Sequence, residues 1–70
     1  MKVDALAIFE NKITGKRKII HNVFFVDLAG YERINKYTIY TNRGDRKIRL
    51  NMSEWTFLES KYVEKEDKHE

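Results

Sequence analysis

Residues 37–50 read YTIYTNRGDRKIRL, and this stretch predicts a β-hairpin. At its centre, Asn, Gly and Asp tolerate the backbone angles that a tight reversal needs. With Arg43 and Gly44 as the two central turn residues, an antiparallel register follows directly. It pairs Thr41 with Arg46, Tyr40 with Lys47, Ile39 with Ile48, Thr38 with Arg49, and Tyr37 with Leu50.

This register separates the side chains of the hairpin into two faces. One face is apolar and collects Tyr37, Ile39, Ile48 and Leu50. The other face is polar and basic and collects Lys36, Thr38, Tyr40, Lys47, Arg49 and Asn51. Because a slip of one residue would mix the two sets, we expect the apolar face to be core and the basic face to be exposed.

Strand patterns also fill the chain before the hairpin. Residues 3–10 form a first apolar run, which a turn at 11–15 closes. Residues 17–28 form a second run rich in Ile, Val and Phe, either as one long strand or as two strands broken near His21-Asn22. A turn at Ala29-Gly30 then leads into the hairpin strands at 33–42 and 46–52.

The segment after the hairpin predicts a helix over about 53–64. Ser53 suits an N-cap, Glu54 suits the first turn, and Trp55, Leu58 and Tyr62 fall at helical spacing. We expect residues 65–70, which are almost all charged, to be a frayed tail. The predicted fold class is α+β, with an antiparallel sheet of about four strands followed by one C-terminal helix in a single domain, residues 1–64.

Composition limits the possible functions. Seventy residues allow one domain, and the absence of cysteine excludes a disulfide framework, a thiolate zinc site and a cysteine nucleophile. His21 and His69 are far apart, and neither Ser53 nor Ser60 has a histidine at a diagnostic spacing. We therefore expect no metal, no cofactor and no enzymatic activity. Because the first residues also lack an apolar leader stretch, we expect a cytoplasmic protein without a membrane segment.

The number of aromatic residues predicts self-association. Nine of the 70 residues are aromatic, which is more than so small a core easily buries. A core of this size contributes only about 3–5 kcal/mol, and oligomerisation is a common remedy. We expect a homodimer. Phe24 and Phe25 would point to opposite faces of a strand, so one of them is expected at a dimer interface or in an exposed binding patch.

Basic residues gather in two parts of the chain. Six lie between residues 33 and 49 beside one acid, Asp45, and three more open the second apolar run. Cations neutralise phosphates and a ring offers a stacking surface for a base, worth about 1–3 kcal/mol. The candidate nucleic-acid-binding residues are Lys16, Arg17, Lys18, Lys36, Tyr40, Arg43, Arg46, Lys47 and Arg49. Two other interpretations stay open: a solvated sheet face that resists aggregation, and a surface for an acidic protein.

A short resemblance adds to this pattern. Residues 47–58 resemble the closing strand and helix start of the positive-cofactor (transcriptional coactivator) family of single-stranded DNA-binding proteins. The matching residues are Ile48, Leu50, Asn51, Glu54, Trp55 and Leu58. That family is related to Pur repeats and Whirly proteins, which share a unit of four strands and a helix. The resemblance implies a dimer that binds single-stranded DNA with Lys36, Tyr40, Lys47 and Arg49 on the binding sheet.

The sequence thus favours a protein that binds single-stranded nucleic acid in replication, recombination or transcription. We expect the nucleic acid to be DNA. In this interpretation Trp55 is a core residue and not a stacking surface. The alternative function is a small protein-interaction module, such as a phage-type inhibitor or regulator of a host protein.

Overall fold

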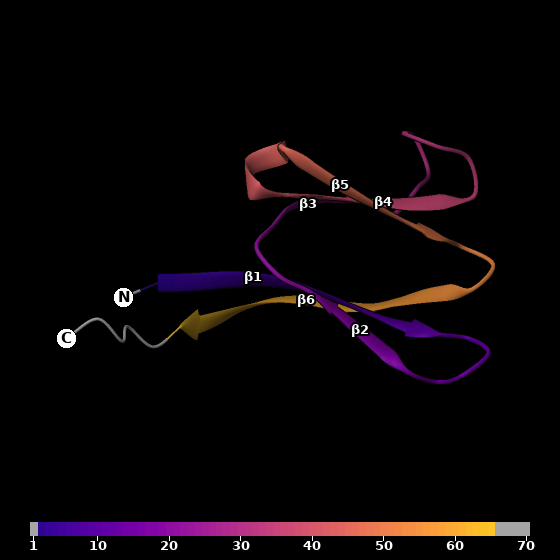
Figure 1. The fold of residues 1–70 in the computed structure, drawn as a ribbon, viewed down its shortest axis with the longest axis horizontal. Helices are drawn as coiled ribbons and strands as arrows, with labels where there is room; N and C mark the ends of the chain where they lie inside the picture. The colour runs from indigo at the N-terminus through magenta and orange to yellow at the C-terminus, as the bar shows by residue number, and fades with distance from the viewer. Residues whose placement is uncertain (1, 66–70) are drawn as a thin grey trace.

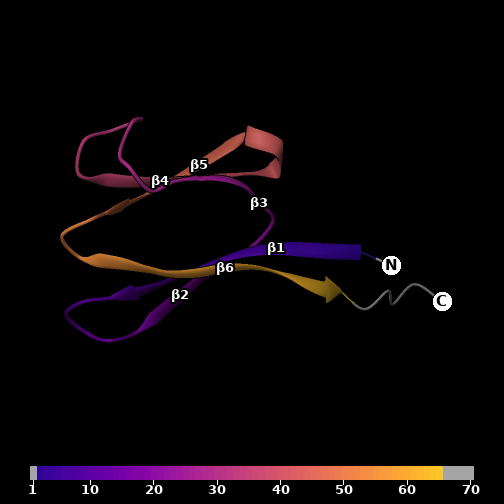
Figure 2. The same ribbon diagram turned by 180° about the vertical axis from the view of Figure 1, so that it is seen from behind.

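The computed structural model describes residues 2–65, and within them the protein is built from strands alone, apart from one short 3-10 turn. Two antiparallel sheets, ordered β2-β1-β6 and β3-β4-β5, form the two layers of Figure 1 and, from behind, of Figure 2. The elements are β1 Lys2–Asn11, β2 Arg17–Ile20, β3 Val23–Asp27, β4 Lys36–Thr41, η1 Asn42–Gly44, β5 Arg46–Asn51 and β6 Trp55–Lys65.

The chain passes between the two sheets at two corners. At the first, His21 and Asn22 separate β2 from β3, and Asn22 has a positive φ of 56°. The buried carboxylate of Asp4 holds this corner: it accepts the Asn22 backbone N–H at 2.8 Å and lies 2.8 Å from His21 Nδ1. The second apolar run of the sequence is therefore two strands and not one.

The core lies between the facing sides of the two sheets. Phe9 of β1 is fully buried, and its ring lies 5.3 Å from the ring of Tyr37 and 5.4 Å from that of Phe57. The buried core residues are Ala7, Phe9, Ile20, Ile39 and Leu50. Burying a side chain of this size stabilises the fold by about 1.5–3 kcal/mol, so these few residues carry much of the stability.

The hairpin register that the sequence predicts is confirmed. β4 and β5 pair Tyr37 with Leu50, Ile39 with Ile48 and Tyr40 with Lys47. The turn between them has positive φ at Asn42, Arg43 and Gly44, as a tight reversal requires. The apolar face packs against the core, since Ile39 and Leu50 are buried and their two neighbours on that face are partly buried.

The predicted C-terminal helix, and with it the α+β fold class, is wrong. Ser53 and Glu54 form a turn, and the residues that follow form β6, which pairs with β1 along its whole length. Trp55 and Phe57 also alternate with a period of two, and this strand pattern prevails over the helical spacing of Leu58 and Tyr62. The long strand β1 needs a partner on this side for its backbone groups, and β6 supplies one.

The C-terminal boundaries differ accordingly. Lys65, which the sequence placed in the charged tail, is the last residue of β6, and residues 66–70 lie outside the described part of the chain. A register shift between Ile8 and Phe9 leaves one extra residue in β6, a β-bulge at Leu58. Within residues 2–65 there is no helix of the length and hydropathy needed to span a membrane.

Candidate nucleic-acid interface

One acid dominates the outer face of the β4–β5 hairpin. Glu32, from the loop between β3 and β4, lies over this face and contacts three of its side chains. Its carboxylate accepts hydrogen bonds from Arg49 Nη2 at 3.0 Å and from the Tyr40 hydroxyl at 3.2 Å, and it lies 3.5 Å from Lys47 Nζ. Two of the predicted phosphate-binding cations are therefore already paired.

The loop that carries Glu32 is held in place by Asp27 at the end of β3. The Asp27 carboxylate accepts backbone N–H bonds from Ala29 at 3.1 Å, from Gly30 at 3.0 Å and from Glu32 at 2.8 Å. These bonds, the one from Glu32 above all, lower the pKa of Asp27 below its ordinary value despite an opposing effect of burial. The ionised form of Asp27 thus fixes the loop that positions Glu32.

The electrostatics of this face follow from the same contacts. The hydrogen bond from Arg49, then that from Tyr40 and the charge of Lys47, lower the pKa of Glu32. Burial, followed by the hydrogen bond to Glu32, raises the pKa of Tyr40. Glu32 is therefore ionised and Tyr40 neutral at physiological pH, and the net positive charge of the face is reduced.

The Tyr40 ring is also less available than the sequence predicts. Lys47 Nζ lies 5.5 Å from its centroid, and the Phe25 ring lies 5.9 Å away on the neighbouring strand. Phe25, which is 57% exposed, is the more accessible aromatic surface here. Lys36, at the start of β4, is half-buried and donates from Nζ to the side-chain oxygen of Asn51.

A second basic region lies in a groove between the edge strands β2 and β5. The groove has a volume of about 390 Å³ and receives one cation from each strand, Lys18 and Arg46. Apolar and polar groups complete its lining: Ile19, Ile20, His21, Asn22, Thr41, Asn42 and Ile48. Within residues 3–64, whose side chains the structure describes, neither Lys18 nor Arg46 forms an ion pair.

Strand alternation explains why these two cations reach the groove. Lys18 pairs with Phe9, and Arg46 is followed by Ile48 and Leu50 at the same alternating positions. Opposite and alternate residues share one face of a sheet, so both cations start on the inner, core-facing sides. Both side chains are exposed, and they lie at the open side of the sandwich between β2 and β5. One residue of each basic cluster of the sequence, Lys18 and Arg46, thus lines this groove.

Three other predicted site residues are exposed and do not line the groove. Arg17 lies 3.8 Å from the Glu10 carboxylate across the β1–β2 pair, a weak surface contact. Lys16 is in the turn before β2, and Arg43 is in the η1 turn next to Asn42. Trp55 packs against the core, as predicted, although from a strand, and Lys18 Nζ lies 5.7 Å above its ring.

Sequence reasoning missed two features of the site: the carboxylate of Glu32 over the hairpin face, and the asparagine pair in the groove. Glu32 directly precedes the basic segment, but nothing local indicates that its loop folds back onto the sheet. Asn22 and Asn42 line the groove, and Asn22 Nδ2 donates to Asn42 Oδ1 at 2.6 Å. The sequence did contain a signal that the two cations face inward. Lys18 alternates with Ile20, and Arg46 alternates with Ile48 and Leu50.

No family model, curated protein or solved structure matches this chain. The resemblance of residues 47–58 to the positive-cofactor family is therefore untested by these comparisons. The helix that this resemblance predicted after Ser53 is the strand β6.

Proposed function

We propose that the protein binds single-stranded nucleic acid, and that the phosphates lie in the groove between β2 and β5. The observation that carries this proposal is the convergence on one groove of Lys18 and Arg46, two cations without an ion-pair partner among residues 3–64. Cations without a protein counter-ion release bound counter-ions when they meet phosphates, which is the main source of affinity for nucleic acid. The proposal includes the cytoplasmic location that the sequence predicts.

The other groups of the groove favour a single strand over a duplex. The amides of Asn22 and Asn42 and the imidazole of His21 can donate and accept hydrogen bonds, as base edges require. A groove of about 390 Å³ admits a splayed nucleotide, whereas a duplex keeps its bases stacked inside. Phe25 adds an exposed ring at a separate position, on the outer face of the β3-β4-β5 sheet.

A titration of a fluorescent oligonucleotide against the full chain tests the proposal. Anisotropy is measured at several salt concentrations with a single strand and with the matching duplex. We expect binding at low salt, a steep loss of affinity with salt, and a preference for the single strand. A protein that does not bind either oligonucleotide at low salt would contradict the proposal and leave a protein-interaction module as the better account.

A further inference from the structure

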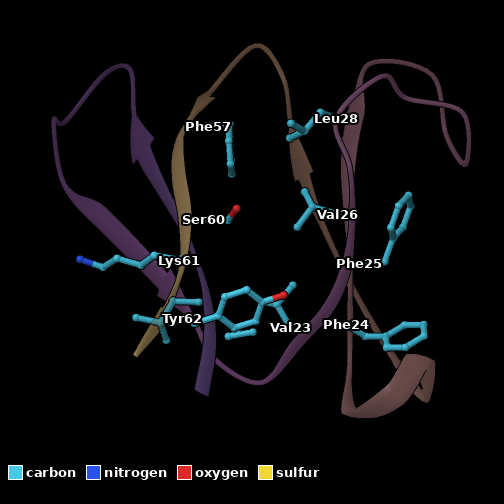
Figure 3. Close-up of a pocket in the computed structure, with 11 residues that line it drawn as sticks. Val23, Phe24, Phe25, Val26, Leu28, Phe57, Ser60, Lys61 and Tyr62 are labelled. Carbon is cyan, nitrogen blue, oxygen red and sulfur yellow. The ribbon is translucent and has the colours of Figure 1, made fainter. Parts of the chain in front are cut away.

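The free edge of β6 borders a second groove, which is apolar. It lies between β6 and β3, the edge strands on the opposite side of the sandwich, and has a volume of about 420 Å³. In Figure 3 the side chains of Phe57, Ser60 and Tyr62 point from β6 toward Val23 and Val26 of β3. Tyr62 is nevertheless 80% exposed, and no described strand pairs with this side of β6.

The far end of β6 belongs to a two-stranded ribbon. β2 pairs only with residues 7–10 of β1, so residues 2–6 of β1 pair with β6 alone among the described strands. In Figure 1 this end of β1 and β6 projects to the left, beyond the β3-β4-β5 sheet. Two strands alone are marginally stable in water, and a third strand beside them stabilises such a ribbon.

The order of residues along this edge is self-complementary. Residues 58–62 read Leu-Glu-Ser-Lys-Tyr, with an acid and a base placed symmetrically about Ser60 and an apolar residue at each end. We propose that β6 pairs antiparallel with β6 of a second copy about a twofold axis at Ser60. Glu59 then lies opposite Lys61 of the second copy, twice.

Charge selects this register among its neighbours. An axis at Glu59 would place two carboxylates opposite each other, and an axis at Lys61 would place two ammonium groups opposite each other, which is destabilising. The axis at Ser60 replaces both clashes with two opposite-charge pairs. It also joins two three-stranded sheets into one, ordered β2-β1-β6-β6-β1-β2, and leaves no exposed edge at β6. This inference is independent of the nucleic-acid proposal.

A charge-swap experiment on the full chain tests the pairing. Light scattering over a concentration series gives the dimer dissociation constant of Glu59→Lys, of Lys61→Glu and of the double swap. Each single change creates two like-charge contacts, so we expect about a tenfold rise in the dissociation constant, and recovery in the double swap. Glu54→Lys, at an exposed acid before β6, is the matched control and should leave the constant unchanged.

A monomeric wild-type chain at tens of micromolar, or a double swap as weak as the single changes, would overturn the pairing. Cross-linking then locates the axis. The chain has no cysteine, and opposed Cα atoms of paired strands lie about 4.5–5.5 Å apart, within the range of a disulfide. Ser60→Cys should oxidise to a covalent dimer much faster than Ser53→Cys, and equal rates would overturn the proposed axis.

Discussion

The outer face of the β4–β5 hairpin and the groove between β2 and β5 carry the same kinds of cation but differ in their counter-ions. On the hairpin face, Lys47 and Arg49 share the carboxylate of Glu32. In the groove, Lys18 and Arg46 have no ion-pair partner among residues 3–64. The number of cations on a surface therefore does not predict a phosphate site, because one acid from the loop before β4 pairs with two of them here.

Removal of Trp55 should have the largest effect on the molecule. Trp55→Ala deletes a large side chain that packs against the core and supports Lys18 above its ring. We expect the free energy of unfolding to fall by about 3 kcal/mol, measured by urea denaturation. This is a large part of the stability of so small a domain. A variant that keeps its stability but loses oligonucleotide binding would instead make Trp55 a stacking surface.

Removal of Glu32 should make the hairpin face resemble the groove. Glu32→Gln frees Lys47 and Arg49, so the single-strand affinity should rise. The slope of log affinity against log salt should steepen by up to about 1.4, since each phosphate contact contributes about 0.7. Anisotropy titrations measure both quantities. A fall in affinity would mean that Glu32 orients the hairpin cations for binding, and would contradict the distinction between the two regions.

Low pH should remove the negative charge of Glu32 without a mutation. The pKa of Glu32 is lowered in the folded protein, so its contribution to stability is present above the ordinary value of 4.5 and is lost as the pH falls through the lowered value. The wild-type protein should therefore lose more stability between pH 7 and pH 3 than Glu32→Gln does. Urea denaturation across this range measures the difference. Parallel curves for the two proteins would show that the Glu32 contacts do not persist in solution.

Tyr40 should have the smallest effect on binding. Its ring is covered by Lys47 and Phe25, so Tyr40→Ala should change the single-strand affinity little, whereas Phe25→Ala removes an exposed ring. This expectation departs from the stacking role that the sequence predicts for Tyr40. Loss of about 1–3 kcal/mol of binding free energy in Tyr40→Ala, with an unchanged salt slope, would restore that role.

The sequence predicts local pairing well in this protein and distant contacts poorly. The β4–β5 register follows from a turn with Asn, Gly and Asp between two alternating segments, and all the information lies within 14 residues. The state of residues 53–64 depends on β1, which is more than 40 residues away in the chain. Leu58 and Tyr62 suggest a helix, but as a strand this segment supplies β1 with a partner and places Phe57 beside the buried Phe9.

The candidate site also has a part that the sequence predicts and a part that it does not. Both basic clusters are evident from the residues, and the alternation of Lys18 with Ile20 and of Arg46 with Ile48 already indicates inward-facing cations. The neutralising contact of Glu32 depends on the path of the loop between β3 and β4, which Asp27 fixes through backbone N–H groups. No periodic pattern encodes that path, so the hairpin face was predicted to be freer than it is.

The most direct test of the proposed interface is a pair of matched double neutralisations. Lys18→Gln/Arg46→Gln alters the groove and Lys47→Gln/Arg49→Gln alters the hairpin face, and each removes the same charge. The salt dependence of single-strand affinity is measured for both, after circular dichroism shows that both are folded. We expect the slope to fall by about 1.4 in the groove variant and to change little in the hairpin variant. The reverse order would contradict the groove as the site of phosphate binding.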